Sequence, residues 1–330
     1  MKEKVLIIGS NSFSGSNFVD FLITKGYRVI GVSRSREINK IFLKYKYNKN
    51  LKNFKFYRID INKQNQKLIS VIKKEKPKII INFAAQGMVA ESWINPLDWY
   101  NTNFLSLTKL IEKIKNFKFV KKFIQFTTPE VYGNTPYVIK ENFNFKPSTP
   151  YALSRASLDF HLKNLFDTFK FPIIFTRTAN VFGPHQQLYR IIPKFIISAK
   201  KNINFFLDGM GKTNRSFIHI EDVNRALYKI VIKGKIGETY HISTNRFLSL
   251  RQLIEIICLK LKIKNKSFIK LNKKDRLGKD KSYKLNSEKI RKLNWKDNIS
   301  LENGIVDTIN WVNTNFKIIN KLSLKYRHKK

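Results

Sequence analysis

Residues 5–15 read VLIIGSNSFSG, an apolar run rich in β-branched residues that leads into a turn bounded by Gly9 and Gly15. The two glycines stand six positions apart, between a predicted strand and a predicted helix. In this setting, backbone amides and the helix N-terminus can face a pyrophosphate. The middle position holds Ser12 instead of glycine, and an ordinary strand-to-helix turn can have the same spacing. The stretch therefore predicts the first unit of a nucleotide-binding sheet, which the rest of the chain has to support.

The same alternation of apolar runs and helical patterns continues through the first half of the chain. Strands are expected at 5–9, 28–33, 54–60, 78–85, 122–128 and 171–178, and helices near 15–25, 64–75, 99–116 and 150–170. Strands that are continuously apolar and separated by helices are typical of a parallel sheet covered on both faces. The sequence therefore predicts an α/β protein with a doubly wound, Rossmann-type parallel sheet.

The pattern changes after residue 185. A helix near 190–200, short strands in 202–207, 216–220 and 239–243, and helices near 221–232, 249–261 and 301–315 predict a smaller mixed α/β part. We expect a cofactor-binding domain over residues 1–185 and a substrate-binding part over 186–316 that interleaves with it. The last residues, 317–330, form a basic tail that is expected to be a solvated extension.

The charge of the chain is unusual: 64 Lys and Arg face 23 Asp and Glu, for a formal net charge of +41. Such an excess can indicate a nucleic-acid partner, and that function stays open as an alternative. However, the excess is mostly lysine, is spread over every segment, and accompanies abundant Asn, Ile and Phe, as adenine- and thymine-rich codons would produce. Because no nucleic-acid-binding motif accompanies it, we expect no specific nucleic-acid partner. A positive surface would still steer an anionic substrate.

Other common classes of site are not indicated. Cys258 is the only cysteine and lies in an apolar helical run, which favours core packing over a disulfide. The five histidines show no metal-ligand spacing, so no metal site is expected. No stretch approaches the ~18 apolar residues of a membrane span. The first strand begins at Val5, which leaves no room for a signal peptide. A cytoplasmic protein without a membrane partner is expected.

The end of the second predicted strand bears on the choice of cofactor. In an NAD-binding unit, an acidic residue at this place binds the ribose diol. Here Ser33 is followed by Arg34, about 20 residues beyond the glycine turn. A missing acid and an added cation favour a 2′-phosphate, and hence NADP over NAD. A surface arginine in a basic chain would look the same.

Residues 149–155, TPYALSR, place Tyr151 and Arg155 four positions apart near the start of a helix. A tyrosine and a cation at this spacing can form the acid/base pair of a nicotinamide enzyme, although lysine is the more suitable cation. The same residues are also what an ordinary helix start requires, with Thr149 as the cap and Pro150 in the first turn.

Further motifs follow each other in order along the chain. They are INFAAQ (81–86), ESWINP (91–96), NTN (101–103), FTTPEVYG (126–133), TPYALSR (149–155), TANVFGPHQQLYRIIPKF (178–195), NRSFIHIEDVNRAL (214–227) and DRLGKDKSY (275–283). With the glycine turn, this series resembles the extended short-chain dehydrogenase/reductase superfamily. Within it, the series is most similar to nucleotide-sugar 4,6-dehydratases, such as dTDP-glucose and GDP-mannose 4,6-dehydratases.

The resemblance implies a role for each matching residue. The cofactor would be bound by Gly9, Asn11, Ser12, Phe13, Ser14, Gly15, Ser33, Arg34, Asp60, Ile61, Ala84, Ala85, Gln86, Asn103, Tyr151 and Arg155. The nucleotide-sugar substrate would be bound by Ser92, Glu130, Asn180, Arg190, Arg215, Arg276 and Tyr283. The catalytic residues would be Thr128, Glu130, Tyr151 and Arg155. A homodimer formed through the helices near 99–116 and 150–170 is implied as well.

The implied reaction explains these residue types. Tyr151, assisted by Thr128, would take the proton of the sugar's 4-hydroxyl while carbon 4 is oxidised. The resulting ketone acidifies carbon 5, Glu130 would remove that proton, water would leave across carbons 5 and 6, and hydride would return to carbon 6. A 4-epimerase needs no base at carbon 5, so Glu130 distinguishes the two activities.

Two departures from the family pattern keep alternatives open. Pro129 stands where dTDP-glucose dehydratases carry an aspartate that protonates the leaving hydroxyl, although GDP-mannose dehydratases also lack it. Arg155 replaces the family's lysine, and arginine is longer and planar. A nucleotide-sugar 4-epimerase and a catalytically weak cofactor-binding protein therefore remain as alternatives to the dehydratase.

Overall fold

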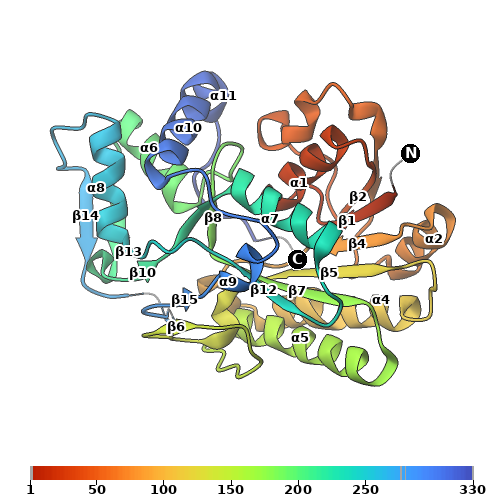
Figure 1. Ribbon diagram of the computed structural model, residues 1–330. Coiled ribbons are helices and arrows are strands. Elements are labelled where there is room, and N and C mark those ends of the chain that lie inside the picture. The colour runs from red at the N-terminus through yellow and green to blue at the C-terminus, as the bar shows by residue number, and fades with distance from the viewer. Residues whose placement is uncertain (1–2, 276, 279, 329–330) are drawn as a thin grey trace.

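The computed structural model describes residues 3–275, 277–278 and 280–328. Its centre is a seven-stranded sheet in the order β12-β7-β5-β4-β1-β2-β3, in which every neighbouring pair is parallel (Figure 1). The strands are β1 (Lys4–Ile8), β2 (Arg28–Ser33), β3 (Phe54–Arg58), β4 (Ile79–Asn82), β5 (Lys122–Thr127), β7 (Ile173–Thr178) and β12 (Thr239–Ile242). The predicted doubly wound parallel sheet is confirmed.

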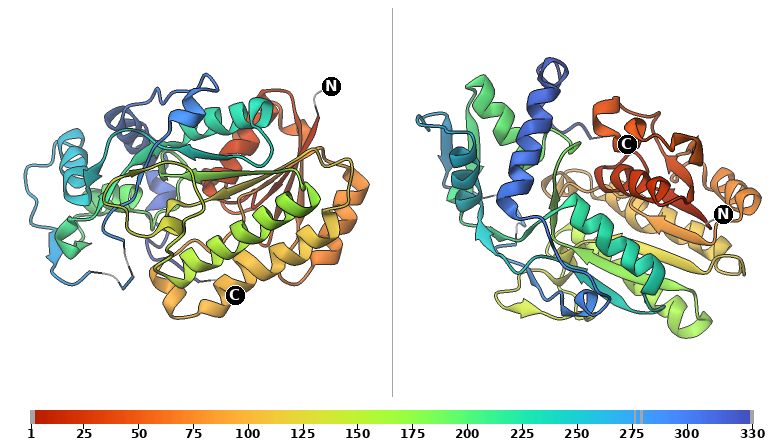
Figure 2. Two further views of the ribbon diagram at one scale, coloured as in Figure 1. Left: turned by 60° about the horizontal axis from the view of Figure 1, so that its bottom comes forward. Right: turned by 45° about the horizontal axis from the view of Figure 1, so that its top comes forward.

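Helices cover both faces of this sheet, which explains why its strands are continuously apolar. Along β1, Val5 and Ile7 belong to one buried core, whereas Leu6 and Ile8 belong to the other. The first face is covered by α1 (Phe13–Thr24) and α7 (Ile220–Lys233), and the second by α2 (Asn65–Glu75), α4 (Ser106–Ile114) and α5 (Pro150–Phe169) (Figures 1 and 2).

Capping side chains fix the two helix starts that face the carboxyl edge of the sheet. Ser12 caps α1 by accepting a hydrogen bond from the amide of Gly15 (3.0 Å). Thr149 caps α5 by accepting one from the amide of Ala152 (3.1 Å), with Pro150 as the first helical residue. The expected helix near 99–116 consists of α3 (Pro96–Tyr100), a π-helical turn η5 (Asn101–Leu105) and α4.

A second part has its own buried core, to which Cys258 belongs as expected. Its helices are α6 (Ile191–Lys201), α8 (Leu250–Lys260), α10 (Leu301–Thr314) and α11 (Phe316–Ile319). Two-stranded pairs are β9 (Phe205–Asp208) with β14 (Ile269–Asn272), β8 (Asn180–Phe182) with β11 (Phe217–His219), β10 (Asn214–Arg215) with β13 (Leu248–Ser249), and β6 (Val138–Ile139) with β15 (Lys284–Leu285). Short elements are η1 (Lys40–Phe42), η2 (Lys44–Tyr47), η3 (Leu51–Asn53), η4 (Ala90–Trp93), η6 (Pro129–Tyr132), η7 (Gly209–Gly211) and α9 (Glu288–Arg291).

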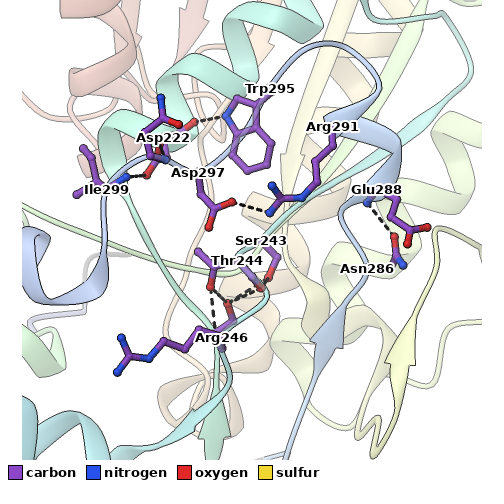
Figure 3. A network of polar contacts seen from close by, with 12 residues as sticks. Asp222, Ser243, Thr244, Arg246, Asn286, Glu288, Arg291, Trp295, Asp297 and Ile299 are labelled. Atoms are coloured by element: carbon purple, nitrogen blue, oxygen red, sulfur yellow. Dashed lines mark hydrogen bonds and ion pairs between the residues drawn. The ribbon is translucent and has the colours of Figure 1, made fainter.

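Segments beyond residue 185 also build the large sheet and its layers. β12 is the outermost strand next to β7, and α7 packs beside α1. Asp222 on α7 anchors the chain where it leaves α9 for α10 (Figure 3). Its carboxylate accepts hydrogen bonds from the amides of Asn298 (2.8 Å) and Ile299 (3.1 Å), and its carbonyl accepts one from the indole of Trp295 (2.9 Å). The two parts are therefore joined through buried and partly buried polar contacts.

The end of the chain corrects the expectation of a solvated tail. After α11, Leu322 and Leu324 are partly buried against the core of the second part. Further along, the ring of His328 stacks on Trp99 of α3, with centroids 5.0 Å apart. In the part of the chain that the structure describes, no helix is both long and apolar enough to cross a membrane.

Candidate active site

A cavity of about 1260 Å³ lies between the carboxyl ends of the sheet strands and the second part. Most of the residues expected from the sequence line it. They are Gly9, Asn11, Ser12, Phe13, Ser14, Ser33, Arg34, Asp60, Ile61, Ala84, Ala85, Gln86, Thr128, Glu130, Tyr151, Arg155, Asn180, Arg190, Arg215 and Tyr283. One large cavity thus brings together residues from nine segments of the sequence, at the edge of the sheet where such folds bind ligands.

Three expected residues support the cavity without lining it. Gly15 lies in the first turn of α1, where a Cβ would collide with the carbonyl of Gly9. Asn103, in the π-helical turn, brackets Gln86: its side chain accepts from the amide of Gln86 (2.7 Å) and donates to its carbonyl (3.0 Å). Ser92, expected as a substrate contact, instead accepts a hydrogen bond from the amide of Tyr151 (3.2 Å). Arg276 lies outside the described residues.

The glycine turn fits a dinucleotide because it leaves no room for side chains. Gly9 has a positive φ of 88°, and a Cβ there would lie 2.6 Å from the amide nitrogen of Ala84. The turn is also tied to the end of β2, since Ser33 accepts a hydrogen bond from the amide of Asn11 (2.9 Å). These contacts hold the backbone close to the helix N-terminus, as a pyrophosphate site requires.

The other half of the expected cofactor site follows β2 and β3. Arg34 directly follows Ser33 at the carboxyl end of β2 and lines the cavity. Asp60 and Ile61 follow β3, and the carboxylate of Asp60 accepts a hydrogen bond from the amide of Asn62 (2.9 Å). The described side chains at the end of β2 therefore offer a hydroxyl and a guanidinium, and no carboxylate, to a ribose in this part of the cavity.

Two side chains that follow β5, the hydroxyl of Thr128 and the carboxylate of Glu130, form a hydrogen bond with each other. Thr128 caps the short helix η6, and its hydroxyl donates to Glu130 Oε2 (2.9 Å). Pro129 between them is the first residue of that helix, where a missing N–H costs nothing. Burial raises the pKa of Glu130 above its usual range, while the hydrogen bond from Thr128 and the charge of Arg215 oppose that shift. Glu130 is thus a carboxyl group tuned towards accepting a proton.

Tyr151 faces the same region from the first turn of α5. Burial raises the pKa of its phenol, and the nearby negative charge of Glu130 raises it further. The charge of Arg155 and a hydrogen bond with Thr128 act in the opposite direction. The phenol is therefore protonated at neutral pH, and it becomes a base only when more positive charge is added beside it.

Arg155 lies one turn further along α5 and is 2% exposed. Its Nε donates to the hydroxyl of Thr127 (3.2 Å), and its Nη2 donates to the carbonyl of Phe126. Its third nitrogen, Nη1, is buried and has no hydrogen-bond partner among the described residues. A buried donor without a partner is costly, so this atom is suited to receive an acceptor from a bound molecule.

The second part supplies the opposite wall. Arg215 on β10 stacks over the ring of Tyr283, with its guanidinium carbon 4.2 Å from the ring centroid, and donates to the carbonyl of Asp280 (2.8 Å). Tyr283 in turn donates its hydroxyl to Asn180 (2.6 Å). Arg190 lies just before α6 and also lines the cavity. Two guanidinium groups thus face the space opposite the catalytic candidates, where an anionic ligand would be favoured.

Sequence reasoning missed some of the residues around this site. Asp280 lines the cavity, accepts a hydrogen bond from Ser148 (2.8 Å), and has a pKa that burial raises. It belongs to the DRLGKDKSY motif, from which only Arg276 and Tyr283 were selected. Tyr326 of the tail also lines the cavity. The sequence signal for a packed tail was the alternation of apolar or aromatic residues with polar ones in KLSLKYRH (321–328).

Comparisons with known proteins show which family and fold the chain resembles. A family model described as GDP-mannose 4,6 dehydratase matches residues 6–308. Human dTDP-D-glucose 4,6-dehydratase is 31% identical over 332 residues, which cover 95% of this chain and 91% of that protein. The structure of a dTDP-glucose 4,6-dehydratase from Streptomyces venezuelae, with NAD bound, superposes with a TM-score of 0.88 at 26% identity and covers 96% of this chain and 98% of that one. A UDP-glucose 4-epimerase from Thermotoga maritima has a TM-score of 0.83 at 26% identity, covering 95% and 99%.

Proposed function

The chain belongs to the GDP-mannose 4,6-dehydratase family, and on that premise we propose that it is a nucleotide-sugar 4,6-dehydratase. The proposal rests on the position of Glu130: its carboxylate accepts a hydrogen bond from Thr128 in the cavity that Tyr151 and Arg155 also line. A dehydratase needs a base for carbon 5 beside the groups that oxidise carbon 4. The similarity to dTDP-glucose 4,6-dehydratases over nearly the whole chain supports the same reaction.

In the proposed reaction, a nicotinamide dinucleotide held at the glycine turn and beside Tyr151 and Arg155 would supply the hydride acceptor for carbon 4 and the hydride donor for carbon 6. Tyr151 takes the proton of the 4-hydroxyl, and Thr128 positions that hydroxyl. Glu130 then removes the proton of carbon 5, and the hydroxyl of carbon 6 departs as water. The raised pKa of Glu130 makes its carboxylate a stronger base for carbon 5, and the carboxyl group that has gained this proton then carries one that it can pass to the departing hydroxyl. Glu130 can therefore serve where Pro129 supplies no acid.

Arg155 has two parts in this proposal. Its bonds to Thr127 and to the carbonyl of Phe126 hold the end of β5, which carries Thr128 and Glu130. Its unpartnered Nη1 would bind a hydroxyl of the nicotinamide ribose, and its charge favours the phenolate of Tyr151. Arginine thereby takes over the work of the lysine that the family carries at this position.

We further propose NADP rather than NAD as the preferred cofactor. Arg34 lines the cavity at the carboxyl end of β2, where an acidic residue would bind the ribose diol of NAD. A charge-assisted contact from Arg34 to a 2′-phosphate would favour NADP by about tenfold. Titrating both cofactors into the wild type and into Arg34→Ala tests this choice. The variant should lose affinity for NADP alone, and an equal loss for both cofactors would contradict the assignment.

A homodimer is proposed as the assembly. Large apolar side chains on the outer surface of the helices expected to form the interface are solvent-exposed: Leu97 on α3, Leu105 in η5, and Leu153 and Phe160 on α5. Exposed apolar groups gathered on neighbouring helices are typical of a protein–protein interface. A cytoplasmic location is proposed because the chain has one cysteine, Cys258, and therefore no intramolecular disulfide.

Incubation with a panel of nucleotide-activated hexoses tests the proposed activity. The wild type should convert at least one of them to a 4-keto-6-deoxy product, identified by mass spectrometry and NMR. Glu130→Gln should abolish product formation, whereas Glu112→Gln, which changes a half-exposed carboxylate on α4 outside the cavity, should not. A 4-epimer as the product, retained by Glu130→Gln, would establish the epimerase instead. If none of the sugars is converted, the proposal that the chain is an enzyme acting on nucleotide sugars is contradicted.

A further inference from the structure

The last eight described residues, 321–328, form an extended segment that returns from the second part of the molecule to the large domain (Figure 2). We call this segment the strap. Its side chains alternate: Leu322, Leu324, Tyr326 and His328 are partly buried, whereas Lys321, Ser323, Lys325 and Arg327 are exposed. This two-residue period is that of an extended chain lying with one side on a surface. The strap is therefore packed along its length.

Three successive anchors carry the strap across the molecule. Leu322 and Leu324 pack on the core of the second part. The ring of Tyr326 meets that of Tyr189 edge-on, with centroids 5.2 Å apart, and its hydroxyl lies 3.5 Å from Gln86 Oε1. Because Gln86 follows β4 and Tyr189 precedes α6, Tyr326 touches both walls of the cavity.

The third anchor lies on the large domain. The ring of His328 is stacked on Trp99 at an angle of 10°, and its Nε2 lies 2.7 Å from the carboxylate of Asp98. Trp99 is fully buried, so this end of the strap rests on a fixed part of α3. At this end, one ring stack and one polar contact join the strap to the large domain, so detaching it here breaks few contacts.

The strap also faces the charged half of the cavity. Lys325, Tyr326 and Arg327 all line it. Burial raises the pKa of Tyr326 to about 12, and the charges of Arg34 and Arg190 oppose that shift, so both guanidinium groups act on its phenol. Tyr326 is therefore within electrostatic reach of Arg34 at the end of β2 and of Arg190 in the second part. The cations beside it add to the positive potential over the cavity.

We propose that the strap is part of the dinucleotide-binding site and keeps the bound dinucleotide in place, with Lys325 and Arg327 acting on its phosphates. This inference rests on the proposed function, in which the dinucleotide returns to its starting state in every turnover and does not have to leave. A segment that spans the cavity from one wall to the other slows dissociation of a ligand beneath it. Two cations on that segment suit a ligand with a pyrophosphate.

The rate at which the dinucleotide leaves tests the strap directly. NADPH fluorescence, followed after mixing the complex with excess NADP, reports release without any sugar present. The double variant Tyr326→Ala/His328→Ala should release NADPH at least about tenfold faster than the wild type. Tyr326→Phe keeps the ring contact with Tyr189 and should release it at the wild-type rate. Thermal unfolding of each variant checks that both parts stay folded.

A second pair of variants separates the charges of the strap from its anchors. Lys325→Gln/Arg327→Gln should weaken NADPH binding by about tenfold at low salt and by less at high salt. Lys292→Gln/Lys296→Gln removes the same charge from exposed lysines that do not line the cavity, and should have little effect. An equal loss of affinity in both pairs would overturn the role of the strap cations.

Two results would overturn the strap as a whole. Release of NADPH at the wild-type rate from the double alanine variant is one. Faster association with unchanged release is the other, because it would mean that the strap obstructs the cofactor instead of retaining it. These outcomes are independent of the proposed activity. If the double alanine variant releases NADPH faster but the wild type dehydrates no sugar, only the proposed dehydratase activity is refuted. If the wild type is an active dehydratase but release from the variant is unchanged, only the proposed role of the strap is refuted.

Discussion

Two inward-facing carboxylates, Asp222 and Glu130, show how differently this molecule uses the same chemical group. Asp222 is fully buried, and its two oxygens accept hydrogen bonds from the amides of Asn298 and Ile299, with Arg225 as an additional ion pair. Glu130 lines the cavity, where its carboxylate accepts the hydroxyl of Thr128 and its pKa is raised by burial.

The difference lies in what surrounds each carboxylate. Two backbone amides and a guanidinium compensate Asp222 for the loss of water, so its charge holds two chain segments together. Glu130 is desolvated with weaker compensation, so the protein holds a group that gains from taking up a proton. The first arrangement stabilises the fold, and the second places reactivity in the cavity at some cost in stability.

The largest effect is expected from Glu130→Gln. Removing the base for carbon 5 should lower the rate of product formation about 10³-fold, while the free energy of unfolding at neutral pH should not fall, because the amide needs no charge compensation. Steady-state rates and urea unfolding measure the two quantities. A loss of stability as large as that caused by changing Asp222 would mean that Glu130 is a structural carboxylate.

Asp222→Ala should show the opposite pattern. It leaves the amides of Asn298 and Ile299 without their acceptor and should lower the free energy of unfolding by about 3 kcal/mol. The rate constant per folded molecule should stay within about twofold of the wild type. Urea unfolding combined with active-site titration provides both values. A variant with unchanged stability and a large loss of turnover would contradict the comparison.

Substitutions of Arg155 extend the comparison to a cation that serves both purposes. Arg155→Ala should lower turnover about 10²-fold and also destabilise the end of β5, since Thr127 and Phe126 lose their donor. Arg155→Lys should keep most of the turnover, because the charge beside Tyr151 remains. Pre-steady-state oxidation and thermal unfolding distinguish the two roles. Equal losses in both variants would show that only the guanidinium shape matters.

The smallest effect is a dependence of stability on pH. Since the pKa of Glu130 is raised in the folded chain above its ordinary value of 4.5, the folded state binds the extra proton, and stability is lost as pH rises through that window. Glu130→Gln lacks this loss. The difference between variant and wild type should therefore grow by up to about 1.4 kcal/mol per pH unit from pH 4.5 to the raised pKa of the folded state, and stay constant above it. A difference that shrinks with rising pH would mean that the pKa is lowered.

The large sheet was predictable because its signals are local. The run VLII is apolar at every position since its residues alternate between two buried cores, and the first six strands predicted for this sheet begin and end within three residues of the observed ones. Helix starts at Ser12 and Thr149 were likewise marked by capping residues that act within one turn.

Contacts between residues far apart in the sequence could not be predicted in this way. The strand predicted at 239–243 was assigned to the smaller part, but the observed strand, β12, is the seventh strand of the large sheet. The sequence did not indicate this pairing, because the partner strand β7 lies more than 60 residues earlier. The tail gave a local signal in its alternating residues, yet nothing near it in sequence indicates Tyr189 or Trp99 as partners. Ser92 matched a motif, and only the fold reveals that it holds the amide of Tyr151.

Deuterium at carbon 5 of the product tests the central claim most directly. When the wild type turns over its nucleotide sugar in heavy water, Glu130 removes the proton of carbon 5, and solvent deuterium replaces it as hydride adds to carbon 6. NMR should find one deuterium at carbon 5 of the 4-keto-6-deoxy product, and Glu130→Gln should give none while still oxidising carbon 4. A product with ordinary hydrogen at carbon 5, or deuterium incorporated by the variant, would contradict Glu130 as the base.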